Sequence, residues 1–208
     1  MIDAYVWTTS NGFKALIALE ELALPYKIHW IDITKGDQTK PEYLAINPNN
    51  KIPSIIDPDG PDGKPITVFE SGAVLTYLAD KTGKLLAKSG AARYAALEWS
   101  FFNVGGTGPA IGQLGYFTKF AQEKVPHAIE RFTKESERLF RVLDKRLGDE
   151  RYLAGEFSIA DIMNFTWPNA ARTFIGMDLT GYKNMSRWLD ELQARPAFAK
   201  ALATKPDA

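Results

Sequence analysis

The pattern of hydrophobic and polar positions changes once along the chain, near residue 81. Before that point, short apolar runs alternate with amphipathic stretches. "IDAYVW" (2–7) has the length and composition of a strand, and "FKALIALEELAL" (13–24) repeats apolar residues every three or four positions, which is typical of a helix. "YKIHWIDI" (26–33) alternates and is rich in aromatic and β-branched residues, so we expect a second strand. The order strand–helix–strand predicts a right-handed parallel crossover.

A second group of elements follows before residue 81. Residues 53–57 and 66–70 are further strand candidates, and the segment 58–65 between them is dense in Pro, Gly and Asp. Such turn residues predict that the two strands pair as an antiparallel hairpin. The next segment reads as a helix, with Ser71 near its start and Gly83 just past its end. The predicted order is therefore βαβ followed by ββα.

From about residue 90 the strand signals disappear. Residues 91–104 and 128–147 have helical periodicity, and "GGTGP" (105–109) is expected to kink or interrupt the first of these helices. "FSIADI" predicts another helix, with Ser158 as N-cap and Asp161 at the N3 position. A last helix in 185–196 is expected to end at Pro196.

These patterns predict two domains. We expect a small α/β domain at 1–81, a linker at 82–90 and an all-helical domain at 91–208.

Composition narrows the classes of partner. Lys plus Arg and Asp plus Glu are both 25, so the formal net charge is zero. That balance gives no support for a nucleic acid or an anionic membrane surface as the main partner. No apolar stretch has the length of a membrane span, and "MIDAYVW" lacks the basic region of a leader peptide, so we expect a cytoplasmic protein.

The chain of 208 residues contains no cysteine. A disulfide framework, a thiolate metal site and a protein-thiol nucleophile are therefore all excluded. The two histidines, His29 inside a strand and His127 after Pro126, are interpreted as structural. We predict no metal site.

Three segments have residue types suited to binding. Pro53 opens a strand. If the Ile52–Pro53 bond is cis, the Ile52 backbone is free to pair with an extended ligand; if the bond is trans, Pro53 is an ordinary strand start. Glu70 and Ser71 stand where a strand ends and a helix begins, which suits a ligand with an ammonium and a carboxylate group, or else a simple N-cap serine. "TTSNG" (8–12) places small polar groups where the first strand leads into the first helix.

Taken together, these features resemble the cytosolic glutathione transferases, which have a thioredoxin-like domain followed by an all-α domain. The resemblance covers the full length. "SNGFK", "NPNNKIP", "VFESGAVLTYLADKTG", "VGGTGP" and "PHAIERF" are most similar to the Nu class, which includes bacterial glutathione disulfide reductases.

The resemblance implies a role for individual residues. The Ile52 backbone, before Pro53, would pair with the cysteinyl part of glutathione, and Glu70 with Ser71 would hold the γ-glutamyl head. Other residues would bind the glycyl end and the sulfur. Gln38 would reach the glycyl end with Lys51 as charge partner, while Thr9 and Asn11 would contact the sulfur.

The resemblance also implies a homodimer. Arg131 matches a helical-domain arginine that meets glutathione across the dimer interface in that class. Without the resemblance, Arg131 would be interpreted as a surface residue paired with Glu135 at i+4.

Since the chain has no thiol, glutathione must supply the sulfur chemistry. A free thiol has a pKa of about 8.5, and one good donor from Thr9, Ser10 or Asn11 together with a helix N-terminus is sufficient to lower it by about two units. Tyr5 is a rival donor, because other transferase classes use a first-strand tyrosine. Among the three polar residues we expect Asn11 to be the main donor, then Thr9.

We therefore predict an enzyme that reduces small disulfides with two glutathiones. Glutathione conjugation or thiolytic ether cleavage of an electrophile is the alternative, with the electrophile held by the aromatic residues Trp7, Phe13, Tyr116 and Phe117. A non-catalytic binding module with the transferase fold is a second alternative, although the presence of the expected glutathione-binding residues favours the enzyme.

Overall fold

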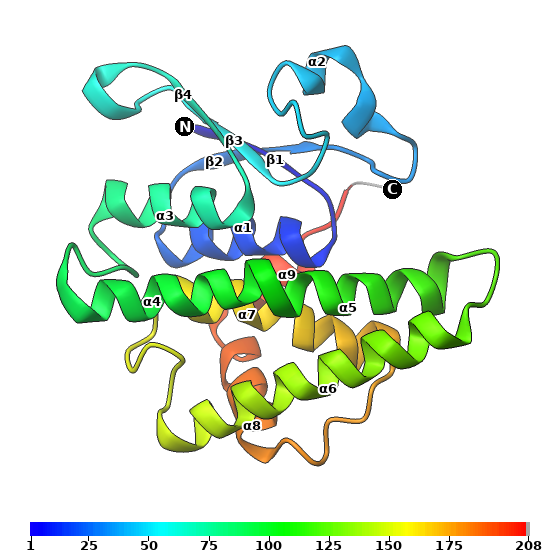
Figure 1. Cartoon of the computed structure of the whole chain (residues 1–208). Coiled ribbons are helices and arrows are strands. Elements are labelled where there is room, and N and C mark those ends of the chain that lie inside the picture. Colours follow the sequence, from blue (N-terminus) through cyan, green and yellow to red (C-terminus); the bar gives the residue numbers. More distant parts are fainter. Residues whose placement is uncertain (207–208) are drawn as a thin grey trace. The chain divides into compact units, whose positions relative to one another are not determined.

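The computed structural model describes residues 1–206. Its helices and strands divide into two compact units (Figure 1). The first contains residues 1–84 together with the described residues from 195 onward, and the second contains residues 85–194. The linker was predicted at 82–90, and the division falls between Lys84 and Leu85.

A mixed four-stranded sheet organises the first unit, in the order β2-β1-β3-β4. Its strands are β1 (Ile2–Val6), β2 (Tyr26–Trp30), β3 (Ser54–Asp57) and β4 (Ile66–Phe69). The pairing of β1 with β2 is parallel, and β3 pairs antiparallel with both β1 and β4. The predicted parallel pairing of the first two strands and the predicted hairpin are therefore confirmed.

Helices cover both faces of this sheet. α1 (Ser10–Glu21) and α3 (Ser71–Thr82) lie on one face, and the short α2 (Pro41–Leu44) lies on the other (Figure 1). A 3₁₀ turn, Asp37–Thr39, precedes α2. Alternate residues of β1 are buried, as are α1 side chains such as Leu16 and α3 side chains such as Leu75. The apolar side chains that repeat along these strands and helices are thus buried between the sheet and the helices.

The last helix, α9 (Pro196–Ala203), packs against α1 within the first unit. The Arg195 guanidinium donates to both carboxylate oxygens of Glu21, at 2.7 and 2.8 Å. The sequence had placed these residues in the helical domain and ended the last helix at Pro196. Instead α8 (Lys183–Gln193) ends earlier, and Pro196 begins α9, because a proline needs no N–H partner in a first helical turn.

The second unit is helical. It comprises α4 (Gly90–Phe102), α5 (Gly108–Gly115), α6 (Pro126–Asp149), α7 (Ile159–Ala170) and α8 (Lys183–Gln193). Between α4 and α5 the chain forms a π-helical turn, Asn103–Thr107, so "GGTGP" interrupts the α-helical pattern while the backbone stays helical. Among residues 1–206, no helix is long and apolar enough to span a membrane.

Two predictions about individual helices are confirmed. Ser158 is the N-cap of α7, and the Asp161 carboxylate at N3 accepts from the Ser158 backbone N–H at 3.0 Å. The helix predicted over 128–147 is α6, and one of its faces is buried at Ser136, Leu139, Phe140, Leu143 and Leu147, while Ile129 and Phe132 at the start of that face are half-buried.

Candidate functional site

The turn between β1 and α1 is built from "TTSNG". Thr9 is the N-cap residue, with extended backbone angles, and its hydroxyl oxygen accepts from the Gly12 N–H at 3.4 Å. A Cβ added to Gly12 would lie 2.0 Å from the Trp7 carbonyl oxygen, so only glycine allows α1 to start this close to the end of β1. Since Thr9 uses only an acceptor lone pair in the cap, its O–H is still able to donate.

Asn11 lies in the first turn of α1, half-buried, and its side chain is oriented by a lysine. Lys14 Nζ donates to Asn11 Oδ1 at 3.1 Å. An ammonium group can only donate, so the oxygen of the Asn11 amide faces Lys14 and the N–H₂ end is directed elsewhere. Asn11 therefore presents a donor, which is the property that an anionic ligand atom requires.

Lys14 itself is 2% exposed. Burial lowers its pKa to about 7, against a smaller opposing effect of the Glu70 carboxylate. Sequence reasoning missed this residue. The available signal was a lysine three positions after Asn11, on a face where neighbouring helix positions are apolar.

Glu70 and Ser71 form the junction between β4 and α3. Glu70 is the N-cap residue, with φ 71° and ψ 120°, and Ser71 is the first residue of the helix. The interpretation of Ser71 as an ordinary N-cap is therefore wrong, because Glu70 occupies that position. Positive φ at a residue with a side chain is uncommon and concentrates at functional sites. The Asn49 amide donates to Glu70 Oε1 at 3.3 Å.

The loop that leads to Pro53 is held by buried polar side chains. The Ile52–Pro53 bond is cis, which decides between the two alternatives left by the sequence. Tyr43 Oη and Asn47 Nδ2 both donate to the Lys51 carbonyl oxygen, each at 2.6 Å. The sheet pairings of β3 begin only at Ser54, so Ile52 lies outside the ladder.

Gln38 lies in the 3₁₀ turn before α2. Its Oε1 atom is buried and has no hydrogen-bond partner among the residues that the structure describes. A buried acceptor without a partner costs about 1–3 kcal/mol, so a ligand N–H at this place would be favoured. The Lys51 side chain, the predicted neighbour of the glycyl end, is exposed.

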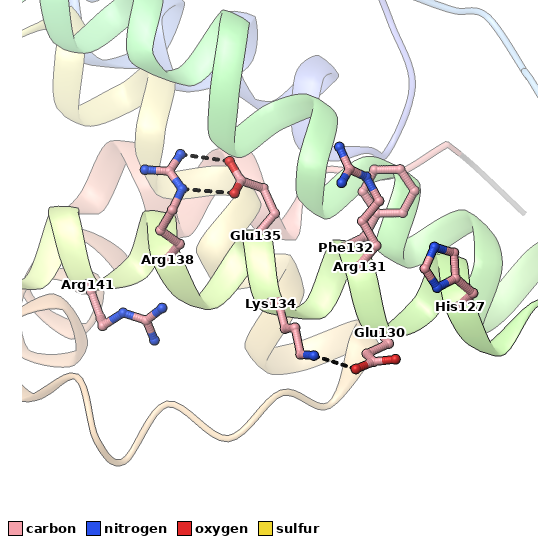
Figure 2. A pocket seen from close by; sticks show the side chains of 8 residues that line it. All are labelled: His127, Glu130, Arg131, Phe132, Lys134, Glu135, Arg138 and Arg141. Atoms are coloured by element: carbon pink, nitrogen blue, oxygen red, sulfur yellow. Dashed lines mark hydrogen bonds and ion pairs between the residues drawn. The ribbon is translucent and has the colours of Figure 1, made fainter.

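Arg131 belongs to the second unit, where it is exposed on α6. It lines an open groove of about 620 Å³ along that helix (Figure 2). The predicted i+4 pair with Glu135 does not form, because Glu135 accepts two bonds from Arg138, at 2.8 and 2.7 Å (Figure 2).

The remaining candidates have mainly packing contacts. His29 Nε2 lies 2.7 Å from Asp3 Oδ1, and the His29 ring stacks on Tyr5 at 4.6 Å inside the sheet, in agreement with a structural role. Burial raises the pKa of Tyr5, with a smaller contribution from Asp3.

The predicted aromatic residues divide between the two units. In the first, Trp7 meets Trp30 edge to face. In the second, Tyr116 packs on Phe117, and Phe117 stacks on Phe132. Residues 1–206 contain no group of three His, Asp or Glu side chains placed to hold a metal ion.

The two units match two family models in turn. Residues 10–81 match the glutathione S-transferase N-terminal domain, and residues 108–196 match its C-terminal domain. The chain belongs to the glutathione S-transferase family. Its predicted fold, a thioredoxin-like domain plus an all-helical domain, is thereby confirmed, whereas the assignment to the Nu class stays a prediction.

Relatives within this family are similar over almost the whole chain. The disulfide-bond oxidoreductase YfcG of Escherichia coli (strain K12) is 46% identical over 204 residues, which cover 97% of this chain and 94% of YfcG. A glutathione transferase from Burkholderia graminis, solved with two glutathione molecules per subunit, is 43% identical with a TM-score of 0.96, covering 100% of this chain and 89% of its own. A glutathione transferase from Pseudomonas putida was solved with one glutathione disulfide per subunit. It is 40% identical with a TM-score of 0.94, and the match covers 99% of this chain and 92% of the Pseudomonas putida chain. The family therefore supports glutathione-dependent chemistry.

Proposed function

We propose that this transferase reduces small disulfides with two molecules of glutathione. The observation that carries the proposal is the pair Thr9 and Asn11 at the N-terminus of α1, in a chain without any cysteine. Donors at a helix N-terminus stabilise an anion, and because the chain has no thiol, that anion is the thiolate of bound glutathione. The name of YfcG and the glutathione ligands of the two solved relatives agree with this chemistry.

Glutathione would bind along the ends of β3 and α3. The Glu70 carboxylate suits the ammonium group of the γ-glutamyl head, and Ser71 with the first N–H groups of α3 suits its carboxylate. The Ile52 backbone, outside the sheet ladder, would pair with the cysteinyl residue as an added strand. Gln38 Oε1 would accept from the glycyl N–H, beside Lys51 at the terminal carboxylate.

The sulfur would lie at the start of α1. Lowering the thiol pKa by about two units requires a preference for the thiolate of about 2.7 kcal/mol. One hydrogen bond to the charged sulfur contributes about 1.5–3 kcal/mol, and the helix N-terminus about 0.3–1 kcal/mol. The Asn11 amide therefore suffices as the main donor, and Thr9 or Ser10 adds to it.

The reaction balances with two glutathiones. The first thiolate attacks one sulfur of the disulfide, forming a mixed disulfide and releasing the other half as a thiolate that takes up a proton. A second glutathione thiolate attacks the glutathione sulfur of the mixed disulfide. The products are glutathione disulfide and two thiols. The protein supplies donors and position but is itself neither oxidised nor reduced.

The proposal includes a homodimer, as in the resembling class. Arg131 is exposed on α6 and so is available to a second copy, where it would meet the partner's glutathione. Light scattering at the monomer mass would contradict this part.

The test is glutathione-dependent reduction of 2-hydroxyethyl disulfide by the purified chain, compared with its Asn11→Ala variant. Loss of one charge-assisted bond predicts a turnover lowered by about 10–100-fold, with a smaller change in glutathione affinity. Asn169→Ala is the matched control, because Asn169 accepts from Arg172 in the second unit and should not affect turnover.

Each other result has a defined meaning. Equal losses of turnover and affinity in Asn11→Ala would show that Asn11 only positions the ligand. Absent disulfide reduction with active conjugation or ether cleavage would assign the thiolate to the alternative chemistry. No glutathione binding by titration calorimetry would instead favour a non-catalytic module.

A further inference from the structure

Lys14 is the one lysine or arginine that is buried among residues 1–206. It sits in the N-terminal half of α1, where the helix dipole disfavours a cation. Burial adds a second cost, because an ammonium group loses its hydration. A local arrangement that is unfavourable on both counts indicates a role other than stability.

The geometry connects this charge to the start of α1. Side chains of a helix lean toward its N-terminus, so a residue at i+3 reaches back over the first turn. Lys14 Nζ accordingly contacts Asn11 Oδ1 at 3.1 Å. Because a protonated Nζ can only donate, this bond selects one of the two amide orientations of Asn11.

The charge also acts on the amide electronically. A donor bond to the amide oxygen draws electron density away from the N–H₂ group and makes it a stronger donor. In a buried site this effect is larger than in water, since less solvent screens the ammonium. The Glu70 carboxylate is close enough to favour the protonated form of Lys14.

We propose that Lys14 is a positioning residue for the thiol chemistry: it fixes the Asn11 side chain with its N–H₂ group toward the sulfur and places a positive charge behind that donor. The inference rests on the proposed function. Lys14 acts through Asn11 and is not assigned a contact with the substrate.

The test compares Lys14→Met with the wild-type chain. Methionine has a similar length and is apolar, so it fills the buried site without adding a polar group of its own, while Asn11 Oδ1 loses its donor. We expect turnover to fall about tenfold with little change in KM for glutathione, because the Asn11 N–H₂ group loses the positive charge that strengthens it as a donor. The apparent pKa of the bound thiol, followed by the ultraviolet absorbance of its thiolate, should rise by about one unit.

Two further measurements separate positioning from a structural effect. The side-chain amide signals of Asn11 in nuclear magnetic resonance should shift in Lys14→Met even without glutathione. In an Asn11→Ala background, Lys14→Met should lower turnover by less than about twofold, because the group it positions is gone. Lys27→Met, at an exposed lysine on β2, is the matched control and should change none of these values.

The outcomes distinguish this inference from the function on which it rests. A wild-type chain that binds no glutathione thiolate would overturn the proposed function and the inference with it. A wild-type thiolate whose pKa is unchanged in Lys14→Met would overturn the inference alone. Equal losses from Lys14→Met in the wild-type and Asn11→Ala backgrounds would also overturn it.

Discussion

Removal of the Asp161 carboxylate should strongly destabilise the helical unit. This side chain is fully buried and accepts from three N–H groups: Leu153 N at 3.1 Å, Ser158 N at 3.0 Å and Trp188 Nε1 at 3.0 Å. It thereby caps α7 and joins it to the preceding loop and to α8. Asp161→Ala leaves these three donors without their acceptor.

The size of the effect follows from these contacts. Each buried donor that loses its partner costs about 1–3 kcal/mol, and such losses are not fully additive within one network. We therefore expect Asp161→Ala to lower the free energy of unfolding by about 3–5 kcal/mol. That is a large share of the 5–15 kcal/mol that is usual for a folded domain.

The assay is urea unfolding at pH 8, followed by tryptophan fluorescence, since Trp188 donates directly to Asp161. Burial raises the pKa of Asp161 to about 6 even though the three donors favour the carboxylate, so the group is ionised at pH 8. Asp178→Ala is the control, because Asp178 is exposed and accepts from Thr180 N at 2.9 Å. The control should lose less than about 1 kcal/mol. A loss in Asp161→Ala no larger than in Asp178→Ala would refute the reasoning.

Three other predictions concern the first unit. The pKa of Lys14 falls from 10.5 to about 7 on folding. Because the unfolded chain then binds more protons, stability should rise by about 2–3 kcal/mol between pH 7 and 9, and urea unfolding of Lys14→Met should lack this rise. Glu70→Gln should raise KM for glutathione about tenfold in steady-state kinetics, because it removes the charge opposite the ammonium group; an effect on kcat alone would contradict that role. Arg195→Ala removes the bidentate pair with Glu21 and should cost about 1–2 kcal/mol, with faster hydrogen exchange in α9; unchanged exchange in α9 would speak against it.

Local patterns were sufficient for much of the fold. The order βαβ-ββα, the N-cap Ser158 and the buried face of α6 all follow from residues that are neighbours in sequence. Turn chemistry and apolar periodicity act over a few residues, so they can be read without the tertiary structure. Pattern matching also extended to the family, because its several motifs occur in order along the chain.

Contacts between distant segments were not predictable in the same way. The docking of α9 on α1 depends on the pairing of Arg195 with Glu21, which are far apart in the chain. The positive φ of Glu70 and the buried oxygen of Gln38 arise from the path of the backbone around them. No periodicity of the sequence contains this information.

The sequence by itself determined that any reactive thiol must come from a ligand, since the chain has no cysteine, and that small polar residues follow the first strand. Only the tertiary structure decided the cis form of the Ile52–Pro53 bond and the burial of Lys14 against Asn11. The physical reason is that burial is a property of packed elements, whereas a lysine in a helix pattern is normally expected at the surface. Folding places this cation where it orients an amide at the start of α1.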